Sequence, residues 1–188
     1  MTACLLVSVA MTGVAQKDYS KSEGLLKYVD PYIGSGFHGH VFVGTSVPYG
    51  MVQVGPNNIH KGWDWCSGYH YSDSILIGFS QTHLNGTGCT DLGDIMIMPM
   101  NEIRTERGKQ SDISNGYASK YSHENEIARP EYYSLLVERY NIKAEMTATD
   151  RVGFHRYTYP AGKPASILVN LHEGNSYTKA KMCYVRKV

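Results

Sequence analysis

The segment GWDWCSGYHYSD, residues 62–73, is unusually rich in side chains that can do chemistry. It holds both tryptophans of the chain, together with two tyrosines, a histidine, a cysteine and two aspartates. An aromatic ring has an apolar face and, in tyrosine and tryptophan, a polar tip, which matches the C–H face and hydroxyl rim of a sugar. The same rings can anchor a loop on a protein core, and we expect that role for Trp65 and Tyr71. The segment therefore suits a recognition surface of which only part meets a ligand.

A second cluster is GSGFHGH, Gly34–His40. Glycine allows the backbone to approach a ligand closely, so N–H groups in this segment could hold an anion or sugar hydroxyls. Tight packing of the loop on itself is the alternative. His38 and His40 raise the question of a metal, but no third ligand follows at a metal-binding spacing, so we expect no metal site here.

The third cluster is SQTHLNGTGCTDLGD, residues 80–94. His83, Asn85 and Thr87 can hydrogen-bond to ligand hydroxyls or satisfy the backbone of their own loop, and both readings stay open. The NGT triplet that begins at Asn85 also fits the short N-glycosylation pattern.

Carboxylates near these loops are Asp64, Asp73, Asp91 and Asp94. An acid–base pair of the inverting type would need two of them about 6.5–9.5 Å apart. Asp91 and Asp94 flank a turn, where carboxylates commonly cap the backbone. The adjacent His172 and Glu173 follow a strand and are expected to form an ordinary strand-end turn. We therefore assign no catalytic residue.

Composition sets the class of protein. The 188 residues are 42% hydrophobic and 19% charged, which is typical of a folded globular chain. A net charge of +1 gives no electrostatic basis for binding nucleic acid or an anionic membrane. Apart from Cys4, the cysteines are Cys66, Cys89 and Cys183, without the CxxC spacing of a zinc site. A Cys66–Cys89 disulfide and two ordinary thiols both remain open.

The N-terminal residues 1–16 resemble the apolar part of a secretory signal peptide, although no basic residue precedes Lys17. The apolar run is too short to cross a membrane as a helix, and we expect no transmembrane segment. The chain is therefore expected to be exported, to the periplasm or outside the cell.

Most of the remaining chain reads as short strands separated by glycine and proline turns. Residues 142–149 and 152–159 alternate most clearly, and the short link Asp150–Arg151 predicts a hairpin between them. A further turn is expected at residues 160–164. These patterns predict an all-β, antiparallel β-sandwich with a long Gly/aromatic-rich loop region in the first third. The expected strands are 51–54, 74–82, 94–98, 132–138, 142–149, 152–159 and 166–170.

Three segments in the same order closely resemble the N-terminal domain of glycoside hydrolase family 92, whose members are exo-acting α-mannosidases. They are YVDPYIGSGFHGH, VPYGMVQVGP and GWDWCSGYHYSDSILIGFSQTHLNGTGCTDLGDIMIMP. The resemblance is near-continuous over residues 28–99 and looser through VGFHRYTYP and ILVNLHEG. Phe37 departs from the pattern, because the family commonly has a second glycine there.

The resemblance implies a two-domain, Ca²⁺-dependent inverting enzyme that hydrolyses terminal α-mannosides, for example of the α-1,2 type. A glutamic acid and an aspartate in a C-terminal (α/α)6 helical domain would act as acid and base, and most Ca²⁺ ligands would lie there too. Residues 25–188 would then be the N-terminal β-sandwich of a larger enzyme, a fragment inactive by itself, whose partners are mannose-containing glycans and that helical domain. The alternative is a stand-alone carbohydrate-binding or structural β-sandwich module.

The resemblance also assigns roles in substrate binding. Trp63 matches the family position that lines the pocket near the leaving-group sugar, and the backbone of Phe37, His38 and Gly39 is expected to meet the terminal mannose. The full set of candidate substrate-binding residues is Phe37, His38, Gly39, Trp63, Cys66, His83 and Asn85.

Overall fold

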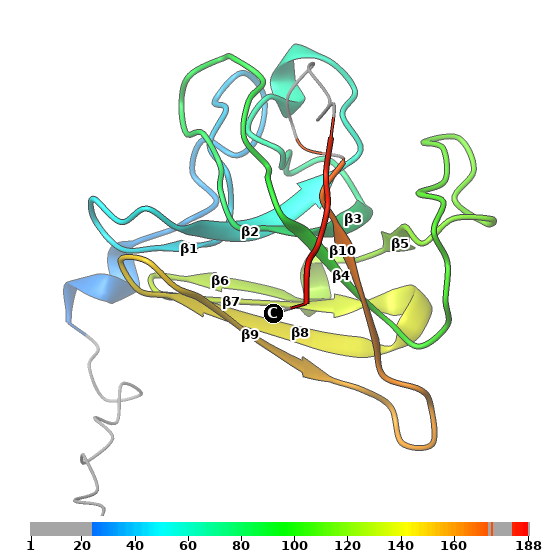
Figure 1. The fold of residues 1–188 in the computed structure, drawn as a ribbon. Coiled ribbons are helices and arrows are strands. Elements are labelled where there is room, and N and C mark those ends of the chain that lie inside the picture. The colour runs from blue at the N-terminus through cyan, green and yellow to red at the C-terminus, as the bar shows by residue number, and fades with distance from the viewer. Residues whose placement is uncertain (1–23, 173, 175–181, 188) are drawn as a thin grey trace, which may run out of the picture.

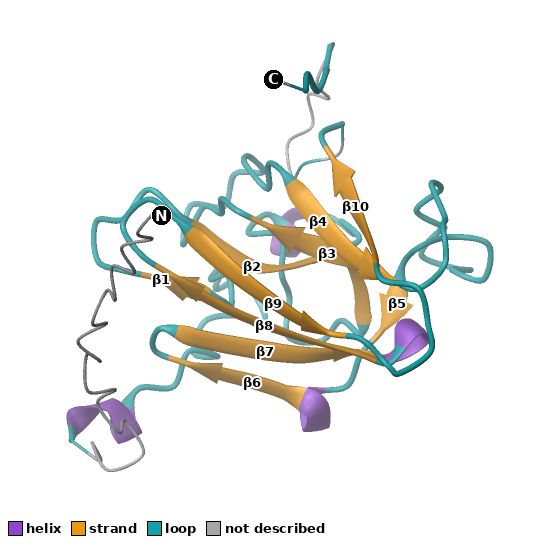
Figure 2. Cartoon of the chain, turned by 60° about the horizontal axis from the view of Figure 1, so that its bottom comes forward, coloured by secondary structure: helices purple, strands orange, loops and turns teal. Residues whose placement is uncertain are grey.

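The computed structural model describes residues 24–172, 174 and 182–187. Within these residues the chain forms two antiparallel β-sheets packed face to face, and no α-helix occurs (Figures 1 and 2). This confirms the predicted all-β antiparallel sandwich. The leader-like residues 1–16 lie outside the described residues.

One sheet has the strand order β1-β2-β3-β4-β10, with β5 pairing to β3, and the other has the order β6-β7-β8-β9. Each of the seven predicted strands is present, with ends shifted by a few residues, while the short strands β1, β5 and β6 were not predicted. The strands are β1 (Thr45–Ser46), β2 (Gln53–Asn58), β3 (Ile75–Ser80), β4 (Met96–Met100), β5 (Ser119–Lys120), β6 (Glu126–Arg129), β7 (Tyr132–Val137), β8 (Ile142–Ala148), β9 (Gly153–Thr158) and β10 (Ser166–Asn170). Four short 3-10 turns complete the described elements: η2 (Leu25–Tyr28), η3 (Trp63–Trp65), η4 (His123–Asn125) and η5 (Glu138–Tyr140).

The alternation of β8 places its apolar residues inside the sandwich, as the sequence predicts. Glu145 is the exception, because its parity is that of the outer face and yet it is only 8% exposed. Arg156 on β9 accounts for this, since its Nε and Nη2 each donate to Glu145 at 2.8 Å. A carboxylate held by such a bidentate pair can be covered without being left unsatisfied.

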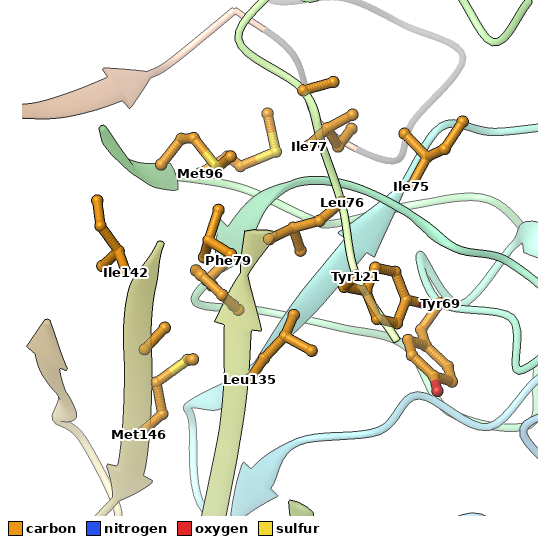
Figure 3. Packing of buried hydrophobic residues seen from close by; sticks show 14 of the residues in the cluster. Tyr69, Ile75, Leu76, Ile77, Phe79, Met96, Tyr121, Leu135, Ile142 and Met146 are labelled. Carbon is orange, nitrogen blue, oxygen red and sulfur yellow. The ribbon is translucent and has the colours of Figure 1, made fainter. Parts of the chain in front are cut away.

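The core lies between the two sheets (Figure 3). Leu76, Phe79 and Met96 come from the first sheet. They pack with Leu135 and Met146 from the second, and all five side chains are almost completely buried. Burial of each large apolar side chain contributes about 1.5–3 kcal/mol, so this layer is the main source of stability.

The first sheet is covered on both faces. Consecutive residues of β3 are all buried, although neighbours in a strand point to opposite sides. In Figure 1 the loop that precedes β1, the loop that follows β2 and the loop that precedes β4 lie over the face of this sheet opposite the second sheet. The Gly/aromatic-rich loops therefore form a third layer, and this layer contains the candidate site.

Two predicted turns have different roles. Residues 149–152 close the β8–β9 hairpin, with the Thr149 amide donating to the Val152 carbonyl at 2.9 Å. Residues 160–164 instead carry the chain between sheets, since β9 pairs with β8 and β10 pairs with β4.

No helix in the described part of the chain has the length and apolar character needed to cross a membrane.

Candidate functional site

The loop 62–73 is built around Trp65. Its indole Nε1 donates to Asp73 Oδ2 at 2.8 Å, and its ring stacks on His70 with centroids 4.3 Å apart. Asp73 is buried and also accepts from the backbone amides of Ser74 and Ile75 and from Lys61 Nζ at 2.9 Å. A buried carboxylate with four donors is fully satisfied. Trp65 therefore anchors the loop, as predicted.

Trp63 points the other way. It is 56% exposed, and its Nε1 donates to the carbonyl of Gly88 at 2.8 Å. Its ring meets His40 edge-on at 4.2 Å between centroids and lies 5.4 Å from the ring of His38. The indole is therefore held from one side and leaves aromatic surface open to solvent, which suits the stacking role predicted for it.

Beside this indole, Asp64 lies between two histidines. His38 Nδ1 is 2.6 Å from Asp64 Oδ1, and His40 Nε2 is 3.6 Å from the same oxygen. The hydrogen bond from His38 lowers the pKa of the Asp64 carboxyl. The His40 side chain is only 6% exposed, and its Nε2 has no hydrogen bond within ordinary distance. In the described residues, no group of three or more His, Cys, Asp or Glu side chains is arranged to hold a metal ion.

The Gly34–His40 loop is folded tightly on itself. Val41 N donates to Gly34 O at 3.1 Å, and a side chain at Gly39 would collide with the Gly34 carbonyl, 2.0 Å from an added Cβ. Phe37 is 88% exposed and has φ of 50°, in the left-handed region that favours glycine. This backbone explains why glycine suits the position where Phe37 departs from the family pattern.

The Phe37–Gly39 stretch is also linked to the tryptophan loop. The Phe37 carbonyl lies 3.3 Å from His70 Nε2, and the Ser35 carbonyl accepts from the Tyr71 amide at 2.8 Å. Residues 34–40 and 62–73, predicted separately, therefore form one surface.

His83 lies beneath this surface. It is 4% exposed, its Nδ1 donates to the Gln53 carbonyl at 2.8 Å, and its ring stacks on Phe42 at 4.9 Å. Its Nε2 lies 3.1 Å from Ser80 Oγ and 3.0 Å from Asn57 Oδ1. Burial lowers the pKa of His83 to about 4, so the ring is neutral at ordinary pH. This environment is that of a structural histidine, and the predicted contact of His83 with substrate stays a prediction.

Asn85 and Cys66 differ in exposure. Asn85 is exposed, and the amide of the next residue, Gly86, donates to the His40 carbonyl at 2.8 Å. Cys66 is 1% exposed, and burial raises the pKa of its thiol. The described cysteines Cys66, Cys89 and Cys183 form no disulfide. Asn85 is thus accessible to a ligand as the chain stands, whereas Cys66 is covered.

Two polar residues under the site were missed by sequence reasoning. His123 and Glu126, in η4 and at the start of β6, contact the tyrosines of the loop 62–73. Their three-residue spacing was the only sequence signal, and it is too common to indicate a site. Elsewhere, a hollow of about 870 Å³ lies between residues 105–109, the end of β10 and residues 183–185. It contains none of the predicted site residues.

Known proteins provide a direct comparison. The sequence model of the glycosyl hydrolase family 92 N-terminal domain matches residues 28–188. A family GH92 α-mannosidase from Bacteroides thetaiotaomicron, solved in complex with mannoimidazole, superposes with a TM-score of 0.79 at 40% identity, over 82% of this chain and 20% of that one. A family GH92 inverting mannosidase from Bacteroides thetaiotaomicron VPI-5482 gives a TM-score of 0.61 at 25% identity, over 77% and 19%.

A curated relative, an "Uncharacterized secreted glycosidase" of Arthroderma benhamiae, is 30% identical over 154 residues, which are 78% of this chain and 20% of that protein. The chain thus spans about a fifth of the length of the relatives it matches.

Proposed function

Since this chain belongs to glycoside hydrolase family 92 and has the fold of the family's N-terminal domain, we propose that it forms the sugar-facing N-terminal part of an exported α-mannosidase. The observation that carries this proposal is the exposed Trp63 indole, held by Gly88 and His40 beside the His38–Asp64 pair. Such a surface combines apolar stacking area with hydrogen-bonding groups, as sugar recognition requires.

The proposed substrates are terminal α-mannosides of mannose-containing glycans, for example of the α-1,2 type. The names of the matched structures support mannose as the sugar, because two of them are called mannosidases and one is bound to mannoimidazole. Trp63 would contact the leaving-group sugar, and the backbone of Phe37–Gly39 would meet the terminal mannose. Asn85 would hydrogen-bond at the edge, with Cys66 and His83 shaping the layer beneath.

We place the acid, the base and the Ca²⁺ site of the inverting reaction in a helical domain. Ca²⁺ prefers six to eight oxygen ligands. The surface around Trp63 offers two imidazoles and the carboxylate of Asp64, a donor set that does not suit this ion. The residues around Trp63 would bind and orient the sugar.

A partner domain is supported by exposed apolar side chains near the start of the described residues. Contiguous apolar surface on a soluble chain marks an interaction site. Segment 25–33 presents five such residues, each more than half exposed: Leu25, Leu26, Tyr28, Val29 and Ile33. We propose that they contact the helical domain. Export is supported by the leader-like residues 1–16 and by the relative that is named as secreted.

The alternative, a sugar-binding module that acts without a catalytic partner, draws on the same exposed Trp63. The two are separated by assaying the 188-residue chain with an α-1,2-linked mannobiose, with and without Ca²⁺. We expect no hydrolysis by this chain alone. Calcium-dependent hydrolysis by this chain would overturn the proposal that the acid and the base lie in a helical domain. Tight, Trp63-dependent binding of mannobiose to the chain alone would favour the binding module.

A further inference from the structure

Glu126, a buried acid, and His123 contact the loop 62–73 of the candidate site. His123 Nδ1 lies 2.5 Å from Glu126 Oε2, and His123 Nε2 lies 2.6 Å from the carbonyl oxygen of Tyr71. The imidazole stacks parallel on the Tyr71 ring, with centroids 4.2 Å apart. The Glu126 side chain has no exposed surface, whereas that of His123 is 32% exposed.

Glu126 accepts hydrogen bonds from three directions. Besides His123, the hydroxyl of Tyr133 donates to Oε1 at 2.6 Å and the hydroxyl of Tyr69 donates to Oε2 at 3.2 Å. An ionised carboxylate is a pure acceptor, and three donors fit that form. Burial, and after it the charge of Glu126, raise the pKa of the Tyr121 and Tyr133 phenols, so they keep their protons.

The two contacts of His123 favour its cationic form while Glu126 is ionised. Neutral imidazole has one N–H donor and one acceptor nitrogen, whereas imidazolium has two donors. Both nitrogens of His123 face oxygens that only accept, the Glu126 carboxylate and the Tyr71 carbonyl. A neutral ring would place a nitrogen lone pair against one of them. The cationic form satisfies both contacts and balances the buried charge of Glu126.

We propose that His123, as an imidazolium paired with Glu126, is a positioning residue that fixes the loop 62–73 of the candidate sugar site. The His123–Glu126 pair is called the clasp below. In the clasp, His123 contacts the Tyr71 carbonyl, and Glu126 accepts a hydrogen bond from the Tyr69 hydroxyl. Between them, His70 stacks on Trp65 and reaches the Phe37 carbonyl, and the Tyr71 amide donates to Ser35. One clasp therefore sets the relative position of both site loops.

This geometry makes the order of the site depend on the charge of His123. The other titratable groups around the clasp are phenols and one carboxylate: Tyr69, Tyr71 and Asp73 from the site loop, Tyr121 before η4, Tyr133 from β7 and Tyr32 from the N-terminal segment. Histidine is the type of side chain that changes charge between about pH 5 and 8. If His123 loses a proton, it loses one donor, and the contact with Tyr71 or Glu126 is broken.

The direct test is ¹⁵N NMR of the chain labelled at histidine. We expect the His123 ring to show two protonated nitrogens at mildly acidic pH and to lose one as pH rises. Over the same range, the exchange protection of the Tyr71 and Asp73 amides, corrected for the intrinsic rate, should fall by about tenfold, the effect of one charge-assisted hydrogen bond. A ring that is neutral at pH 6, or amide protection that does not change with pH, would overturn the proposal.

Two variants separate the charge from simple packing. His123→Gln should lower the protection of the Tyr71 and Asp73 amides at every pH, while His123→Arg, which stays cationic and has several donors, should keep protection high and remove its pH dependence. The matched control is His172→Gln, at an exposed position, which should change neither. If His123→Gln behaves like wild type, the clasp is not a positioning device.

An effect of the clasp on sugar binding rests on the proposed function, whereas the positioning role of His123 does not depend on it. In a longer protein with mannosidase activity, His123→Arg should flatten the alkaline side of the KM profile for a disaccharide. Absence of any mannosidase activity would count against the proposed function and leave the NMR and exchange results to decide on the clasp.

Discussion

The two tryptophans of the chain, Trp63 and Trp65, have opposite roles in the same loop. Trp65 is tied to Asp73 and stacked on His70, whereas Trp63 is held only at its edge and presents aromatic surface to solvent. The difference shows how an aromatic-rich segment can be partly scaffold and partly recognition surface.

We predict that Trp63→Ala, in a longer protein with mannosidase activity, weakens turnover of a mannose disaccharide more than turnover of a mannoside with a small activated leaving group. The reason is the assignment of Trp63 to the leaving-group side, where loss of a stacking contact costs about 1 kcal/mol, or roughly fivefold in kcat/KM. Trp63→Phe should retain part of the effect. Equal losses on the two substrates would place Trp63 at the terminal-sugar site or in the scaffold instead.

A second residue-scale prediction concerns acid stability. Burial lowers the pKa of both His83 and His155 to about 4. Because the unfolded chain binds these protons at higher pH than the native state, the stabilisation is present above about pH 6.5 and is lost as pH falls toward 4. Each site should account for up to about 3 kcal/mol of that loss.

The measurement is the free energy of unfolding by urea between pH 7 and pH 4. His155→Gln should reduce the slope of stability against pH in this interval by about one proton, while substitution of the exposed His172 should leave it unchanged. A slope that is the same in wild type and His155→Gln would show that His155 titrates alike in both states.

At the scale of elements, the join between the β8–β9 hairpin and the first sheet depends on one glycine. An added Cβ at Gly153 would lie 2.6 Å from Val54 Cγ2 and 2.7 Å from Gln81 Oε1. Val54 is completely buried and cannot move aside without disturbing the core. The close approach of β9 to β2 therefore requires a residue without a side chain.

We predict that Gly153→Ala destabilises the chain by about 1–3 kcal/mol, the usual effect of overpacking. The comparison is Lys163→Ala in the exposed turn between β9 and β10, which should change stability by less than about 0.5 kcal/mol. Thermal unfolding of both variants beside wild type measures the difference. A Gly153→Ala protein as stable as Lys163→Ala would mean that Val54 and Gln81 yield easily.

At the scale of the whole molecule, apolar surface is distributed unevenly. Large apolar side chains are more than half exposed at Leu25, Leu26, Tyr28, Val29 and Ile33 of the N-terminal segment, at the loop residues Tyr49 and Met51, and at Phe154 on β9. Exposed apolar patches favour association. We predict that the 188-residue chain alone is poorly soluble and self-associates.

Size-exclusion chromatography with light scattering tests this prediction at several protein concentrations. Replacing Leu25 and Tyr28 by serine should increase the monomer fraction, whereas replacing the buried Leu135 should not improve it. A monodisperse monomer that unfolds cooperatively would contradict the prediction.

The sequence by itself determined the seven longer strands and the hairpin. Alternation in residues 142–149 and 152–159 is a local property, because successive side chains of a strand point to opposite faces whatever the rest of the chain does. The family resemblance likewise depended on the order of local motifs. Glu145 shows where this reasoning ends, since its burial depends on Arg156 from the neighbouring strand.

Only the tertiary structure decided which site residues are exposed and which are buried. The loops around the site have no periodicity, so their side chains are oriented by partners distant in sequence. Examples are Gly88 for Trp63, Gln53 for His83 and Tyr71 for His123. The sequence pattern around a hydrogen-bonding loop residue is the same whether that residue faces a ligand or the core. The choice follows from which buried polar groups must be satisfied, and that depends on contacts between loops and sheet that no local pattern encodes.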